Sequence, residues 1–229
     1  MTVRATAVAA ATGMVLLALT TGCKPTTTTG ASGTTEPAAT SSSAGAAATG
    51  SGAPAPSGGR PPTGPGPQDH YTVQAQPAAG SCHYRHEGGQ PLPDLKCTPG
   101  AVSPAVTQTN LDSTICKSGY TATIRPSSYV TGKEKKANAL SYGYTGPMGD
   151  AEYDHQISLE IGGDPNDPRN LWVEPPSPGH RPGAGPNNDK DKVENKLHFA
   201  VCKRTVTLVQ AQAAIATDWT TALHVLHLS

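Results

Sequence analysis

Two adjacent residues, Asp154 and His155, stand at the start of a stretch that ends in Gly162-Gly163. A neutral imidazole can accept a proton from water near neutral pH, so His155 is a candidate general base. A carboxylate beside it can bind a hard cation such as Mg²⁺, so Asp154 is a candidate metal ligand. The pair is therefore suited to hydrolysis in which one metal ion and one histidine act together.

A longer set of residues around this pair resembles the HNH (His-Me finger) endonucleases, in the form found in exported bacterial proteins. The matching residues are Asp154-His155-x-x-x-Leu159-Glu160-x-Gly162-Gly163, Asn170-Leu171-Trp172, Lys190-Asp191-x-Val193-Glu194-Asn195-x-Leu197-His198 and Val201-Cys202. The resemblance covers about residues 150–220. It implies a ββα core over about residues 150–204 that holds one divalent metal and hydrolyses phosphodiester bonds of DNA, or also of RNA.

The resemblance also implies roles for two residues near the predicted strands. His155 would take the proton from the attacking water. Asn170 would tie down the loop between the strands by side-chain hydrogen bonds to the backbone, and so orient His155. The plainer alternative for Asn170 is an ordinary turn residue after a proline.

A further metal ligand is expected early on the helix of the resembling family. Asn187 and Asn188 both match that place, while Glu194 and His198 are later candidates on nearly one helix face. The alternative role for the two asparagines is helix capping. With Asp154, one of these residues would hold a single Mg²⁺ ion, or alternatively Mn²⁺ or Zn²⁺.

The elements that must position these residues follow from the hydrophobic pattern. Residues 154–163 alternate as a strand does, and residues 170–173 make a second, short apolar strand. A loop rich in Pro and Gly, residues 175–186, separates them from a helix predicted over about residues 189–203. The order strand, turn, strand, loop, helix places the candidate residues on one α+β unit.

The rest of the domain divides into a β-rich subdomain, residues 70–150, and further helices at the C-terminus. In the first part, Tyr120–Arg125 reads as a strand and Lys133–Leu140 as a short helix. In the second, Thr207 and Gln210 have capping-box spacing. The inner face of the helix that follows is expected to comprise Leu208, Ala211, Ile215, Trp219 and Ala222.

Four cysteines fall in this domain. Because the N-terminal residues 1–23 resemble an export signal and the number of cysteines is even, two disulfides are expected. Three pairings are possible. We expect Cys97–Cys116, which closes a short loop, and Cys82–Cys202, which ties the start of the domain to its C-terminal helix. A zinc site is the alternative, but the chain has no CxxC pair.

The N-terminal third is built differently. Residues 1–23 have a basic start, an apolar run and small residues before Cys23, which resembles a bacterial lipoprotein signal. Acylation of Cys23 would anchor the protein at the outer face of the membrane; ordinary cleavage would leave it secreted. All but four of residues 24–68 are Gly, Ala, Ser, Thr or Pro, which predicts a disordered tether over residues 24–69 and a domain over residues 70–229.

Charge limits the function further. The chain has 17 Lys and Arg against 17 Asp and Glu, which excludes a strongly basic, tight nucleic-acid binder. It leaves room for a monomeric enzyme that holds a phosphate with a metal and local cations, expected at Lys190, Lys192, Lys196, Lys203 and Arg204. The sequence therefore predicts an exported, non-specific nuclease. The alternative is an inactive surface lipoprotein that uses the same fold as a binding module.

Overall fold

The computed structural model describes residues 59–228. The signal peptide, the lipidation site Cys23 and most of the tether therefore lie outside the described residues and stay predictions. Within residues 59–228, no helix is long and apolar enough to cross a membrane.

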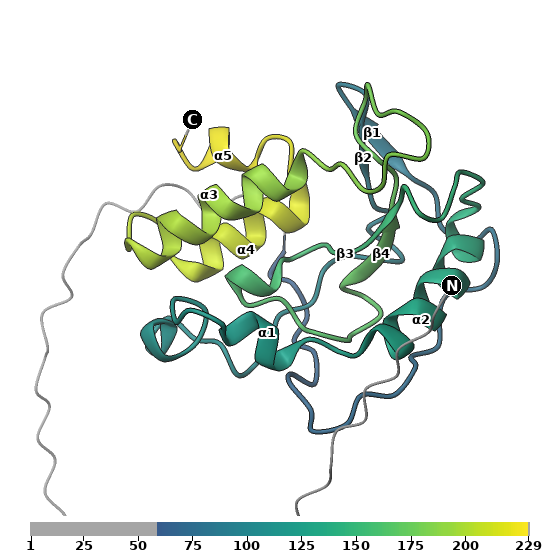
Figure 1. Cartoon of the computed structure of the whole chain (residues 1–229). Helices are drawn as coiled ribbons and strands as arrows, with labels where there is room; N and C mark the ends of the chain where they lie inside the picture. Colours follow the sequence, from purple (N-terminus) through teal and green to yellow (C-terminus); the bar gives the residue numbers. More distant parts are fainter. Residues whose placement is uncertain (1–58, 229) are drawn as a thin grey trace, which may run out of the picture. The chain divides into compact units, whose positions relative to one another are not determined.

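The described chain is a mixed α+β domain with two small sheets (Figure 1). In chain order its elements are β1 (Arg85–Glu87), β2 (Gln90–Leu92), η1 (Leu111–Ser113), α1 (Tyr120–Ile124), α2 (Ser128–Tyr142), β3 (Glu152–His155), η2 (Leu159–Ile161), β4 (Leu171–Glu174), α3 (Lys190–Cys202), α4 (Leu208–Thr217) and α5 (Ala222–Val225), where η denotes a 3₁₀ turn.

Strands β3 and β4 pair antiparallel, with Asp154 opposite Trp172 and His155 opposite Leu171. Helix α2 packs on β4, whereas α3 and α4 pack on η2, which lies in the loop between the two strands (Figure 1). The predicted order of strand, turn, strand, loop and helix is confirmed. The first strand is shorter than predicted, because the chain leaves the sheet after His155.

The main apolar core lies between the η2 loop and the C-terminal helices. Its fully buried side chains include Ile157, Ile161, Leu197, Val201 and Ile215. Each such side chain stabilises the fold by roughly 1.5–3 kcal/mol relative to its exposed state. This core fixes α3 against the loop that begins at His155.

The C-terminal helices confirm part of the predicted pattern. The capping box of Thr207 and Gln210 is present at the start of α4. The helix ends at Thr217 because Asp218 is extended and its carboxylate accepts hydrogen bonds from Thr220. Trp219 therefore lies outside the helix, yet it is only 3% exposed, as a core position should be.

The region predicted as a β-rich subdomain is mostly helix and loop. Tyr120–Arg125 was expected as a strand, which is wrong: Tyr120–Ile124 is helix α1, preceded by Gly119 at φ 81°. Its β-branched residues favour a strand only where a partner strand is present, and here none pairs with it. The predicted helix at residues 133–140 is confirmed and extends over Ser128–Tyr142.

The domain begins earlier than predicted. Residues 61–69 were assigned to the tether, yet Gly64 N–H donates to the Val102 carbonyl (2.9 Å) and Val102 N–H donates to the Pro62 carbonyl (2.9 Å). Gly66 N–H also donates to the Asp164 carboxylate (2.6 Å). Composition could not show this, because backbone hydrogen bonds to distant residues hold the segment.

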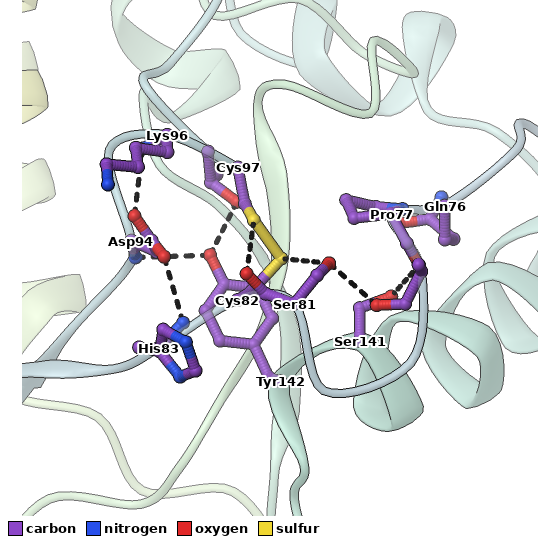
Figure 2. The surroundings of a disulfide bond; sticks show 12 residues. Gln76, Pro77, Ser81, Cys82, His83, Asp94, Lys96, Cys97, Ser141 and Tyr142 are labelled. Carbon is purple, nitrogen blue, oxygen red and sulfur yellow. Dashed lines mark hydrogen bonds between the residues drawn. A yellow bond between two sulfur atoms is a disulfide. The ribbon is translucent and has the colours of Figure 1, made fainter.

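All four cysteines form disulfides, as expected, but the expected pairing is wrong. The bonds are Cys82–Cys97 and Cys116–Cys202. Figure 2 shows the first bond. The Asp94 carboxylate holds the loop between its cysteines by accepting hydrogen bonds from the N–H groups of His83 (2.9 Å) and Lys96 (2.9 Å).

The second bond joins residues 86 positions apart, against 15 for the first. A disulfide that closes a longer loop removes more entropy from the unfolded chain. Replacing Cys116 and Cys202 by alanine should therefore cost about 4.6 kcal/mol of unfolding free energy, against about 3 kcal/mol for Cys82 and Cys97. Urea denaturation of the two double variants measures this. A larger loss for the Cys82/Cys97 variant would contradict the assignment of Cys116–Cys202 as the main constraint.

Candidate functional site

A cavity of about 200 Å³ opens where β3 ends, between η2 and α3. His155 lines it, and so does the exposed side chain of Arg125. The acidic residues that line it are Glu152, Asp154, Glu160, Asp191 and Glu194. One imidazole thus faces a strongly acidic cavity, an environment that attracts a cation.

His155 is the last residue of β3 and is only 7% exposed. Its Nε2 lies 3.0 Å from the Pro165 carbonyl oxygen. A carbonyl only accepts hydrogen bonds, so Nε2 carries the proton and Nδ1 of the neutral ring keeps its lone pair. Burial lowers the pKa of His155 to about 4, against a smaller opposing effect of Asp154. The ring is therefore neutral at pH 7 and able to accept a proton.

Asn170 holds the loop that follows His155. Its Oδ1 accepts hydrogen bonds from the N–H groups of Ile157 (2.9 Å) and Ala101 (3.2 Å). Its Nδ2 donates to the carbonyls of Asp164 (2.9 Å) and Ile157 (3.1 Å). These are side-chain-to-backbone bonds of the kind that the resemblance implied, and they fix the segment carrying the Pro165 carbonyl.

The two glycines after η2 make this loop possible. Gly162 has φ 76°, which favours glycine. A Cβ on Gly163 would lie 1.7 Å from the Ile157 carbonyl oxygen. The Gly-Gly pair seen in the sequence therefore lets the chain turn back tightly enough for Asn170 to reach it.

Lys190, expected as a solvated residue that could touch phosphate, is instead buried at 1% exposure. Its Nζ donates to the Asp154 carboxylate (2.6 Å), to the His155 carbonyl (2.8 Å) and to the Glu194 carboxylate. Burial opposes the charge, but the carboxylates of Asp154, Glu194 and Glu174 outweigh it and raise the pKa of Lys190. The ammonium therefore holds Asp154 beside His155.

Helix α3 turns a different set of residues toward the cavity than the one predicted. Asp191, Glu194 and Asn195 line it, at the i, i+3 and i+4 spacing that defines one helix face. Asn187 is exposed and does not line the cavity; Asn188 is buried and its Nδ2 donates to Glu152 (2.9 Å). Of the candidates from the sequence, Glu194 is therefore the one that the helix brings to Asp154.

The cavity has the donor chemistry that a hard cation prefers. Carboxylate oxygens come from β3 (Glu152, Asp154) and from α3 (Asp191, Glu194). Burial, and then the nearby Asp154, raises the pKa of both Glu152 and Asp191, so a bound cation would relieve their repulsion. Mg²⁺ is usually held by one or two carboxylates together with water, which this set can supply.

A separate group, Cys116, His198 and Cys202, places its ligand atoms within 4.8 Å of one another and could hold a metal ion. The two sulfurs form a disulfide here, and His198 Nε2 lies 2.9 Å from the Ile115 carbonyl oxygen. Cysteine binds metals as thiolate, so this group becomes a ligand set only when the disulfide is reduced. His198 does not line the acidic cavity.

Three of the five cations expected along α3 and at its end pair with carboxylates. Besides the buried Lys190, Lys192 pairs with Asp189 (2.7 Å), and Arg204 after the helix pairs with Asp112 (2.8 Å). The exposed cation at the cavity is instead Arg125, which the sequence did not single out.

Burial of His155 has a measurable consequence for stability. The unfolded histidine binds a proton below pH 6.5, whereas the folded one does so only near pH 4. The unfolding free energy of the wild type should therefore fall as the pH drops from about 6.5 to 4. This fall should be steeper than in His155→Gln, by up to about 1.4 kcal/mol per pH unit. Urea denaturation of both proteins across this range measures the difference, and equal slopes would contradict a neutral, buried His155.

Comparison of the chain with protein-family models, with curated proteins and with solved structures finds no significant match.

Proposed function

We propose that this chain is an exported, metal-dependent nuclease of the HNH (His-Me finger) type that hydrolyses phosphodiester bonds of DNA, or alternatively of RNA as well. The observation that supports this best is the state of His155. Its Nε2–H donates a hydrogen bond to the Pro165 carbonyl. This leaves Nδ1 as an acceptor on a neutral ring beside an acidic cavity. Histidine in this state is a general base for water.

The other residues of the site support this base. Asn170 fixes the loop that holds the His155 ring, and Lys190 holds the Asp154 carboxylate next to it. Asp154 and Glu194, from β3 and α3, would hold one divalent ion, Mg²⁺ in the first place. When bound, such an ion stabilises negative charge on the phosphate and on the leaving oxygen.

The order of elements supports the same proposal. Two antiparallel strands, β3 and β4, are followed by helix α3, which is the order of elements expected of a ββα core. His155 ends β3, Asn170 directly precedes β4, and Glu194 lies on α3. Sequence-specific binding is not expected, because the described residues are accounted for by this core and its supporting elements.

The test is incubation of the full chain with plasmid DNA and with RNA, in Mg²⁺, Mn²⁺ or Zn²⁺. Fragments should form with at least one of these ions, and EDTA should prevent them. Intact DNA and RNA under every metal would refute the proposal.

One observation favours the alternative of an inactive binding module. The Lys190 ammonium already pairs with Asp154 and Glu194, so the negative charge of these two carboxylates is partly neutralised without a metal. Calorimetric titration with Mn²⁺ separates the two functions. An enzyme of the proposed kind binds the ion in a manner that Asp154→Asn abolishes, whereas an inactive module shows no such binding.

A further inference from the structure

Arg125 is placed unlike any other cation at the site. It follows the last residue of α1, it is exposed, and it is absent from the ion pairs found within residues 59–228. Arginine keeps its charge at every physiological pH and presents a planar set of donors. An exposed guanidinium with no carboxylate partner in this part of the chain is available to an anionic ligand.

Arg125 also lines two hollows at once. The first is the cavity of His155, and its charge is near enough to that ring to oppose protonation, after the larger effect of burial. The second is a neighbouring hollow of about 340 Å³, lined by residues 68–71, Thr123, Arg125 and Ser127. Arg125 is the residue that the two share.

The second hollow differs from the first in charge. Asp69 is the single carboxylate among the residues that line it, while His70 and Tyr71 supply planar rings and Ser127 a hydroxyl group. Tyr71 is held in place because its hydroxyl donates to the Ile124 carbonyl (2.7 Å). A chain of phosphates leaving the acidic cavity meets less repulsion here, and the held ring of Tyr71 suits stacking against a nucleotide base.

We propose that Arg125 binds a phosphate adjacent to the one being cleaved, and that the nucleic acid runs from the His155 cavity across Arg125 into the hollow at residues 68–71. This inference rests on the proposed nuclease function and adds a binding site for the neighbouring nucleotide. The guanidinium offsets the repulsion between a polyanion and the carboxylates around His155, and it can bind a phosphate through two donors.

The experiment measures binding separately from cleavage. The full chain carrying His155→Ala is titrated with a fluorescent single-stranded DNA oligonucleotide in Mg²⁺, at several salt concentrations. Adding Arg125→Ala should weaken binding about tenfold and reduce the slope of log affinity against log salt by about one. Arg125→Lys should keep the slope, because it keeps the charge, and recover part of the affinity.

Lys136→Ala is the matched control, since Lys136 is an exposed cation on α2 that lines neither hollow. Added to the His155→Ala chain, which is the parent here, it should leave the DNA affinity and its salt dependence within twofold of the parent's values. If Arg125→Ala binds as the parent does while the wild type cleaves DNA, the Arg125 site is refuted and the nuclease stands. If the parent binds no DNA and the wild type cleaves none, both proposals fail.

Discussion

Replacing His155 by alanine should lower kcat/KM for DNA cleavage by about 10³-fold. A positioned general base contributes roughly 10²–10⁴-fold, and no other histidine lines the acidic cavity within the described residues. The loss should fall mainly on kcat, because in the proposed mechanism the imidazole acts on the attacking water and binds no part of the substrate. Initial rates on a labelled oligonucleotide in Mg²⁺ measure it.

His224→Ala is the matched control, because His224 is exposed on α5 and lines none of the cavities described above. This variant should cleave DNA at the wild-type rate. If His155→Ala keeps more than a tenth of wild-type activity while folded, His155 is not the general base.

Replacing Lys190 by methionine should lower the unfolding free energy by about 4 kcal/mol. Lys190 is 1% exposed, and its ammonium is the partner of two buried carboxylates, those of Asp154 and Glu194. Removing one partner of a buried ion pair leaves an uncompensated charge, which typically costs 3–5 kcal/mol. Denaturation in urea at pH 7 measures the loss.

Lys192→Met controls for this change on the same helix, since Lys192 is exposed and pairs only with Asp189. It should unfold at nearly the wild-type urea concentration. If Lys190→Met does not fold, the double variant Lys190→Met with Glu194→Gln should be the more stable of the two, because it leaves one buried charge fewer. Equal stability of Lys190→Met and Lys192→Met would contradict the buried ion pair.

The sequence predicts part of what surrounds His155. Apolar spacing locates β4 and α3 to within a few residues, whereas the strand predicted over residues 154–163 is β3, which already ends at His155. The side-chain hydrogen bonds of Asn170 are also mostly local: they reach Ile157 and Asp164, fewer than 15 residues away, and the one to Ala101 is long-range.

What the sequence could not predict depends on contacts between distant segments. The pairing of Cys116 with Cys202 follows from the packing of α3 against the chain near η1, which spacing does not reveal. Burial of Lys190 likewise depends on where α3 meets β3. The i, i+3, i+4 spacing of Asp191, Glu194 and Asn195 was readable, but only the fold shows which helix face meets His155.

The most direct test of the central claim is plasmid cleavage by the wild-type full chain in Mg²⁺ and in EDTA, with His155→Ala on the same gel. We predict loss of supercoiled plasmid only in the wild type and only with metal. Equal cleavage by His155→Ala, or cleavage that persists in EDTA, would contradict a metal-dependent nuclease that uses His155 as its base.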